Sequence, residues 1–172
     1  MFVDNIRKLV FIHVPKTGGT SISHTLSTFG EVLKPTHTTY TEAIKLFPDY
    51  YFFCFVRNPW DRIYSNYEHM IRRNKMPFSS FDEYIINYDK KELFSQERYV
   101  TNYKGLVTMD FIGRTEYLHR DFNYICKKFY KDNMTLSTSN YYRSNIKNMS
   151  SEANKIIETY CEWEITTFGY NK

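Results

Sequence analysis

Residues 15–21 combine one lysine, two consecutive glycines and three small hydroxyl residues in the order PKTGGTS. Lys16 supplies a full positive charge, and Gly18-Gly19 permits a tight backbone turn. Thr20 and Ser21 then open a helical pattern. Where such a turn leads from a strand into a helix, backbone N–H groups and the positive end of the helix dipole point at one place. The stretch therefore predicts a loop that binds a phosphate or a group of similar shape.

A second anion-binding pattern follows the apolar run YYFFCFV at residues 50–56. Arg57 stands at the carboxyl end of this run, and its planar fork can donate two hydrogen bonds to one phosphate. Asn58 is suited to the N-cap of the next helix and Pro59 to its first position. Ser65 lies eight residues after Arg57. Neighbouring strand ends of this kind would hold two anionic groups of one ligand.

These residues need a scaffold of strands that end in helices. Apolar runs predict strands, and 3.6-residue periodicity with capping signals predicts helices between them. We expect an α/β fold in a single domain over residues 1–172, with a mostly parallel central sheet flanked by helices. The expected strands cover 8–14, 31–33, 50–56 and 108–113, and the expected helices cover 20–29 (closed by Gly30), 39–47, 59–73, 80–99, 116–130 and 150–168 (closed by Gly169).

Composition limits the classes of function. The chain has 172 residues, 42% of them hydrophobic, and a net charge of +4, which by itself is too small to indicate nucleic-acid binding. The first residues lack the apolar segment of a signal peptide, and no apolar run approaches the ~20 residues of a membrane span. We therefore expect a cytoplasmic protein without membrane insertion. The cysteines lack metal-ligand spacing, so we expect no metal site and buried thiols without disulfides at Cys54, Cys126 and Cys161.

The motifs resemble those of sulfotransferases that use 3′-phosphoadenosine 5′-phosphosulfate (PAPS). Residues 15–21 are similar to the 5′-phosphosulfate-binding loop of that family, and residues 55–65 (FVRNPWDRIYS) to its 3′-phosphate-binding strand and helix. Residues 111–116 (FIGRTE) and 168–170 (FGY) resemble the branch that contains carbohydrate sulfotransferases of the chondroitin and heparan 2-O type. The resemblance implies transfer of a sulfuryl group from PAPS to a hydroxyl of a carbohydrate or small molecule.

The resemblance also implies roles for individual residues. Lys16 would stabilise the leaving phosphate, and Arg57 with Ser65 would bind the 3′-phosphate. The acceptor hydroxyl needs a general base, and His37 occupies the loop between the two motifs, as the catalytic histidine does in heparan 2-O-like members. A carboxylate such as Glu42 is the alternative base. The loop residues implied to bind the donor through backbone amides or hydroxyls are Thr17, Gly18, Gly19, Thr20 and Ser21.

Other residues leave two interpretations open. His13 either supports the loop or packs in its strand, whereas His24, His69 and His119 fall in helical patterns typical of surface or packing residues. Arg114 is a candidate phosphate contact, and Glu116 fits an ion pair at the strand end or a helix cap. Arg143 either closes over the nucleotide or lies on the surface.

Two alternative functions compete with sulfuryl transfer. A nucleoside-triphosphate P-loop requires its lysine after the glycines, but Lys16 precedes them, and the second strand does not end in an Asp that would hold Mg²⁺. The other alternative is a module that binds PAPS or its product PAP (3′-phosphoadenosine 5′-phosphate) without catalysis, and the presence of Lys16 argues against it.

Short connections between the elements favour a small metabolite, lipid or simple sugar over a polysaccharide as acceptor.

Overall fold

The computed structural model describes residues 1–34, 37–88, 95–136 and 149–172. The chain divides into two compact units, the first formed by Met1–Arg57 and Glu97–Asn140 and the second by Asn58–Gln96 and Tyr141–Lys172. The sheet lies in the first unit, and the described part of the second unit consists of helices and their connections. The single domain expected over residues 1–172 stays a prediction.

The first unit contains a five-stranded sheet with the strand order β3-β1-β2-β4-β5. The three strands β2, β4 and β5 are parallel, whereas β1 runs antiparallel to β2 and to β3. The α/β class is thus confirmed, but the sheet is mixed because β1, which the sequence pattern did not predict, pairs with both β2 and β3. The strands are β1 (Phe2–Asp4), β2 (Leu9–Ile12), β3 (Glu31–Val32), β4 (Tyr51–Val56) and β5 (Phe111–Arg114).

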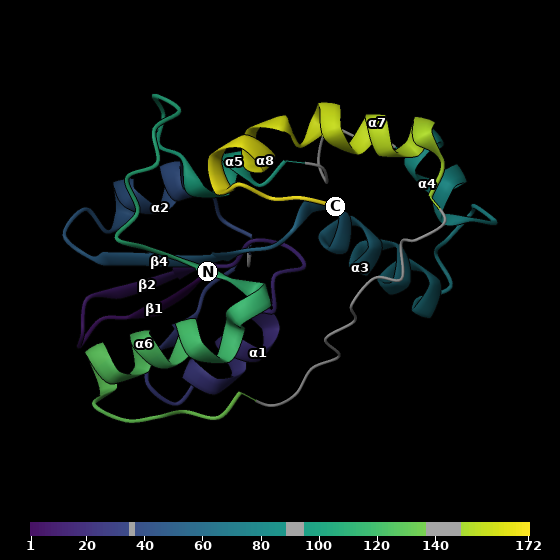
Figure 1. The fold of residues 1–172 in the computed structure, drawn as a ribbon. Helices are drawn as coiled ribbons and strands as arrows, with labels where there is room; N and C mark the ends of the chain where they lie inside the picture. The colour runs from purple at the N-terminus through teal and green to yellow at the C-terminus, as the bar shows by residue number, and fades with distance from the viewer. Residues whose placement is uncertain (35–36, 89–94, 137–148) are drawn as a thin grey trace. The chain divides into compact units, whose positions relative to one another are not determined.

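Helices cover both faces of this sheet, which explains the uninterrupted apolar runs of β2 and β4. Helices α1 (Gly19–Leu26) and α6 (Leu118–Tyr130) cover one face, and α2 (Tyr40–Leu46) lies on the other (Figure 1). A short helix, α5 (Glu97–Val100), contacts α2. The main core is built between the sheet and the α1–α6 layer by Phe2, Leu9, Phe11, Ile22, Leu26, Phe53, Phe55, Phe122, Ile125, Cys126 and Leu136.

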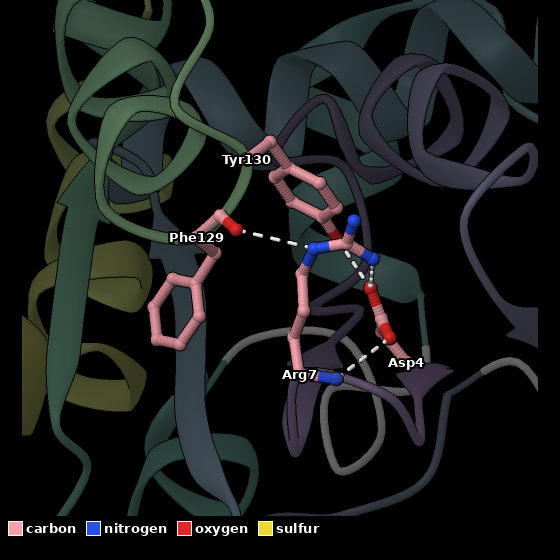
Figure 2. Close-up of polar contacts among 4 residues, drawn as sticks. All are labelled: Asp4, Arg7, Phe129 and Tyr130. Atoms are coloured by element: carbon pink, nitrogen blue, oxygen red, sulfur yellow. Dashed lines mark hydrogen bonds and ion pairs between the residues drawn. The ribbon is translucent and has the colours of Figure 1, made fainter.

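A polar cluster fastens the turn between β1 and β2 to the end of α6 (Figure 2). The fully buried Asp4 carboxylate accepts hydrogen bonds from the Arg7 backbone N–H at 3.0 Å, from Arg7 Nη1 at 2.9 Å and from the Tyr130 hydroxyl at 3.1 Å. Arg7 Nε donates to the Phe129 carbonyl at 3.1 Å, and the guanidinium carbon lies 4.6 Å from the centroid of the Tyr130 ring. Burial and the Asp4 charge raise the pKa of Tyr130, so its hydroxyl stays protonated as a donor.

Two helix boundaries in the first unit differ from expectation. Helix α1 ends at Leu26 with Ser27 as its C-cap, so Gly30 is not the cap that the sequence predicted. A Cβ at position 30 would lie 2.2 Å from the carbonyl oxygen of Val3, and this close approach to β1 explains the glycine. Helix α6 begins at Leu118, after a 3-10 turn over Thr115–Tyr117.

The described part of the second unit contains α3 (Pro59–Arg72), α4 (Phe81–Asn87), α7 (Ser151–Tyr160) and α8 (Glu162–Phe168). The single helix expected over 80–99 is wrong, because α4 ends at Asn87 and the next helix, α5, starts at Glu97. The helix expected over 150–168 is interrupted at Cys161, which ends α7 and precedes α8. Gly169 closes α8 in the left-handed conformation, as expected.

Side-chain hydrogen bonds and a buried charge hold these helices together. Trp60 Nε1 donates to Asn154 Oδ1 at 2.9 Å, which ties α3 to α7. The fully buried Glu164 of α8 accepts from the Gln96 backbone N–H at 3.2 Å. Burial raises the pKa of this carboxyl, and the charge of Arg62 opposes the shift. The cysteines are buried and form no disulfide, as predicted, at Cys54, Cys126 and Cys161.

Candidate functional site

The loop between β2 and α1 turns through two residues in the left-handed conformation. Lys16 has φ 67° and Gly18 has φ 84°, and a non-glycine residue in this region stores strain that is typical of functional sites. The Thr17 hydroxyl donates to the Val14 carbonyl at 2.9 Å, and Thr17 is fully buried. A Cβ at position 18 would lie 3.0 Å from the Leu118 side chain. The loop conformation is therefore set by internal contacts before any ligand binds.

Helix α1 presents its positive end at this loop. Gly18 is the N-cap and has no side chain that could accept from the first turn, and the first turn contains no acidic residue. Within this turn Thr20 is exposed and Ser21 is buried. A helix N-terminus without a neutralising carboxylate favours an anion. The predicted loop residues thus lie at the positive end of the α1 dipole, and Lys16 adds its positive charge to the same loop.

Arg57 joins the second predicted motif to this loop. It directly follows β4, and its Nη1 donates to the Lys16 carbonyl at 3.3 Å. The side chain is only 5% exposed. Because β2 and β4 are parallel neighbours, their carboxyl ends lie at the same edge of the sheet. The structure therefore brings Arg57, the arginine of the second predicted motif, to the loop of the first.

Thr115 is a site residue that the sequence reasoning missed. It is buried directly after β5, and its Oγ1 lies 3.1 Å from the Thr17 carbonyl and 3.0 Å from the Val56 carbonyl. This hydroxyl therefore lies between the last residue of β4 and the loop that follows β2. The signal that could have identified Thr115 is its position inside the FIGRTE stretch, between Arg114 and Glu116.

The residues beside Thr115 are positioned by α6. The Arg114 backbone N–H donates to Asp121 Oδ2 at 2.8 Å, and Arg120 Nε forms an ion pair with the other Asp121 oxygen at 2.8 Å. Arg114 is the last residue of β5, and Glu116 lies within the 3-10 turn. The phosphate contact considered for Arg114 stays a prediction.

His37 lies beside the loop and contacts His13. Its Nδ1 is 2.9 Å from the backbone carbonyl of His13, and the two rings meet edge to face with centroids 4.6 Å apart. Because a carbonyl can only accept, Nδ1 carries the proton, and in the neutral ring Nε2 holds the basic lone pair. His37 is exposed, whereas His13 is half-buried.

The buried position of His13 makes its ring a weak base. Burial, followed by the charges of His37, the chain amino group and Lys16, lowers the pKa of His13 to about 3. His13 is therefore neutral at physiological pH and a poor proton acceptor. Of these two rings, His37 is the better candidate for a general base.

The alternative base, Glu42, is occupied in a helix cap. Its Oε2 accepts from the backbone N–H and from the hydroxyl of Thr39, each at 2.8 Å, and the Thr39 hydroxyl accepts from the Glu42 N–H at 3.3 Å. These bonds, the backbone bond first, lower the pKa of Glu42. A carboxylate held in this way is a weaker base than an ordinary carboxylate. This favours His37 over Glu42 as the candidate general base.

Two further residues of the sequence prediction are Ser65 and Arg143. Ser65 is half-buried in α3, in the second unit, and Arg143 lies outside the described residues. In the described ranges no cluster of three or more His, Cys, Asp or Glu side chains is arranged to hold a metal ion. Every helix over the same ranges is too short or too polar to cross a bilayer.

Comparisons with known proteins cover different shares of this chain. An uncharacterised protein of Archaeoglobus fulgidus is 38% identical over 87 residues, which cover 49% of this chain and 71% of the relative. A crystal structure of a sulfotransferase from Alicyclobacillus acidocaldarius matches with a TM-score of 0.44 and 15% identity, over 76% of this chain and 59% of that one. This chain thus spans about three fifths of that solved protein. A family model described as "Sulfotransferase family" matches residues 1–167, so the chain belongs to the sulfotransferase family.

Proposed function

We propose that this protein transfers a sulfuryl group from PAPS to a hydroxyl of a carbohydrate or small molecule. The observation that carries the proposal is the hydrogen bond from Arg57 to the Lys16 carbonyl, which holds the Arg57 guanidinium beside the loop that is proposed to bind the phosphosulfate. PAPS carries a 5′-phosphosulfate and a 3′-phosphate, so a donor with two separate anionic groups matches two adjacent cationic motifs.

Lys16 and the start of α1 would act on the phosphosulfate. Backbone amides of the loop and the hydroxyls of Thr20 and Ser21 would hold its oxygens. Lys16 would stabilise the negative charge that develops on the bridging oxygen as the sulfur–oxygen bond breaks. Arg57 and, from the family spacing, Ser65 would bind the 3′-phosphate.

His37 would act as the general base for the acceptor. Its Nδ1 is committed to the His13 carbonyl, so Nε2 accepts the proton of the acceptor hydroxyl. The acceptor oxygen forms a bond to sulfur while the bond from sulfur to the bridging oxygen breaks, and PAP leaves. Positioning and charge stabilisation carry such an in-line transfer, and no metal is required in this scheme.

Binding of PAP tests the donor assignment without knowledge of the acceptor. Ligand at about 100 times its dissociation constant stabilises a fold by roughly 2.7 kcal/mol, which raises the Tm of a domain of this size by about 5 to 10 °C. We expect this shift with PAP but not with ATP or AMP. Arg57→Ala should abolish it, whereas Arg73→Ala, a charge loss on the exposed end of α3, should not. An equal shift with ATP would favour the P-loop kinase alternative.

A further inference from the structure

We propose that His13 is a positioning residue whose ring holds the His37 ring in place and links it to the start of α1. This inference rests on the proposed function, because it assigns His13 a role toward the general base of that reaction. The two histidines come from different segments, since His13 follows β2 and His37 precedes α2.

Gly19 shows how closely the His13 ring packs on the donor loop. A Cβ at position 19 would lie 2.0 Å from His13 Cδ2 and 2.3 Å from His13 Nε2. Gly19 is not among the residues with positive φ, so its backbone conformation is one that alanine adopts readily. The His13 ring, and not the backbone, is therefore what requires glycine at the first residue of α1.

The other neighbours of His13 complete a stack of side chains. On one side the ring stacks near the buried Phe11, with centroids 5.9 Å apart and planes inclined by 22°. On another side the His13 ring meets the His37 ring edge to face, with the two ring centroids 4.6 Å apart. The carbonyl of the same residue accepts from His37 Nδ1. His13 thus supplies both the acceptor that sets the tautomer of His37 and the surface that limits rotation of its ring.

The protonation state of His13 suits this role. Burial is the main cause that lowers its pKa to about 3, and the charges of His37 and Lys16 add to the effect. The ring is therefore an uncharged aromatic surface. It does not compete with His37 for the acceptor proton, and it adds no charge beside Lys16.

Paired substitutions separate ring packing from proton chemistry. His13→Ala removes the surface but keeps the carbonyl, and misplacement of the base by about 1 Å should lower kcat about 100-fold. Because donor contacts remain, the donor KM should stay within about twofold. His13→Phe keeps an aromatic ring and should retain most of kcat. A His13→Phe variant as slow as His13→Ala, or a His13→Ala variant with wild-type kcat, would overturn the proposal.

A double-mutant cycle tests the link to α1. Gly19→Ala should lower kcat by pushing the His13 ring toward His37, and it should cost little more in a His13→Ala background, where the added methyl meets no ring. Equal losses in both backgrounds would overturn the link, because the methyl would then act independently of His13.

Nitrogen-15 NMR of the His37 ring gives a readout that needs no turnover. In the wild type we expect the Nδ1-protonated tautomer. In His13→Ala the carbonyl stays, but the ring that holds His37 against it is lost, so this hydrogen bond should weaken and the Nε2-protonated tautomer should appear, with recovery in His13→Phe. An unchanged His37 signal in His13→Ala would overturn the positioning role even in an active enzyme. The proposed function can fail separately. If the three proteins show these His37 signals but the wild type neither binds PAP nor transfers a sulfuryl group, the proposed function is refuted and the contact between the histidines still holds.

Discussion

Replacement of Thr115 by valine tests whether one hydroxyl holds the loop after β2 close to the end of β4. Valine keeps the volume of threonine but removes the O–H group that lies 3.1 Å from the Thr17 carbonyl and 3.0 Å from the Val56 carbonyl. A hydroxyl has one hydrogen, so the substitution removes one shared bond and not two. Loss of a buried partner leaves a carbonyl unsatisfied, which costs about 1 to 3 kcal/mol.

The expected loss is measurable by thermal denaturation. For a chain of this length 1 kcal/mol corresponds to about 2 to 4 °C, so Thr115→Val should lower Tm by about 2 to 12 °C. The affinity for PAP, measured by calorimetry at a temperature where both proteins are folded, should also fall, because the loop that carries Thr17 is less well held.

Two matched variants isolate the cause. Thr115→Ser keeps the hydroxyl and loses one methyl group, which should cost only about 0.8 kcal/mol. Thr101→Val removes a different hydroxyl, one that donates to the Glu97 carbonyl of α5, and should leave PAP affinity unchanged. The reasoning is refuted if Thr115→Val unfolds at the wild-type temperature, or if Thr115→Ser loses as much stability as Thr115→Val.

Three further predictions concern other contacts. Arg57→Lys keeps the charge but loses the planar fork, so the PAP dissociation constant measured by calorimetry should rise about 10- to 100-fold; an unchanged constant would argue against a bidentate contact. Tyr130→Phe removes a hydrogen bond to the buried Asp4 carboxylate and should cost about 1.5 to 3 kcal/mol in denaturant unfolding, and wild-type stability would contradict this. Because the folded pKa of Glu42 lies below its ordinary value of 4.5, its cap contributes stability above that pH and loses it as the pH falls through the folded pKa. Glu42→Gln should flatten this acid step in stability measured against pH, and an identical pH profile would count against the cap.

The sequence predicted the parts of the fold that depend on local pattern. The apolar runs of β2 and β4 stand out because helices cover both faces of the sheet. The helix after β2 begins at Gly19, one residue before the expected start, and the helix after β4 begins at Pro59 as the proline signal indicates. Since parallel strands place their carboxyl ends at one edge, the pairing of the Lys16 loop with Arg57 could also be anticipated.

Features that depend on distant partners could not be predicted in this way. Strand β1 has only three residues and ends in Asp4, which is tolerated in the interior because Arg7 and Tyr130 satisfy its carboxylate. The local pattern predicts Gly30 as a helix cap, whereas the close approach of the Val3 carbonyl is what requires glycine there.

The same limit applies within the candidate site. The bridge from Thr115 to the Thr17 carbonyl spans 98 positions of sequence, and no periodicity connects them. The contact of His13 with His37 likewise arises only when β2 and the segment before α2 are brought together.

Sulfuryl transfer itself is the most direct test of the central claim. PAPS labelled in its sulfuryl group would be incubated with the protein and a mixed library of hydroxyl acceptors, and labelled products and PAP would be measured together. We predict labelled product with the wild type and a loss of about 100-fold or more with Lys16→Ala and with His37→Ala, while His37→Ala still binds PAP. A wild type that binds PAP but labels none of the acceptors would contradict the account and favour the non-catalytic binding module.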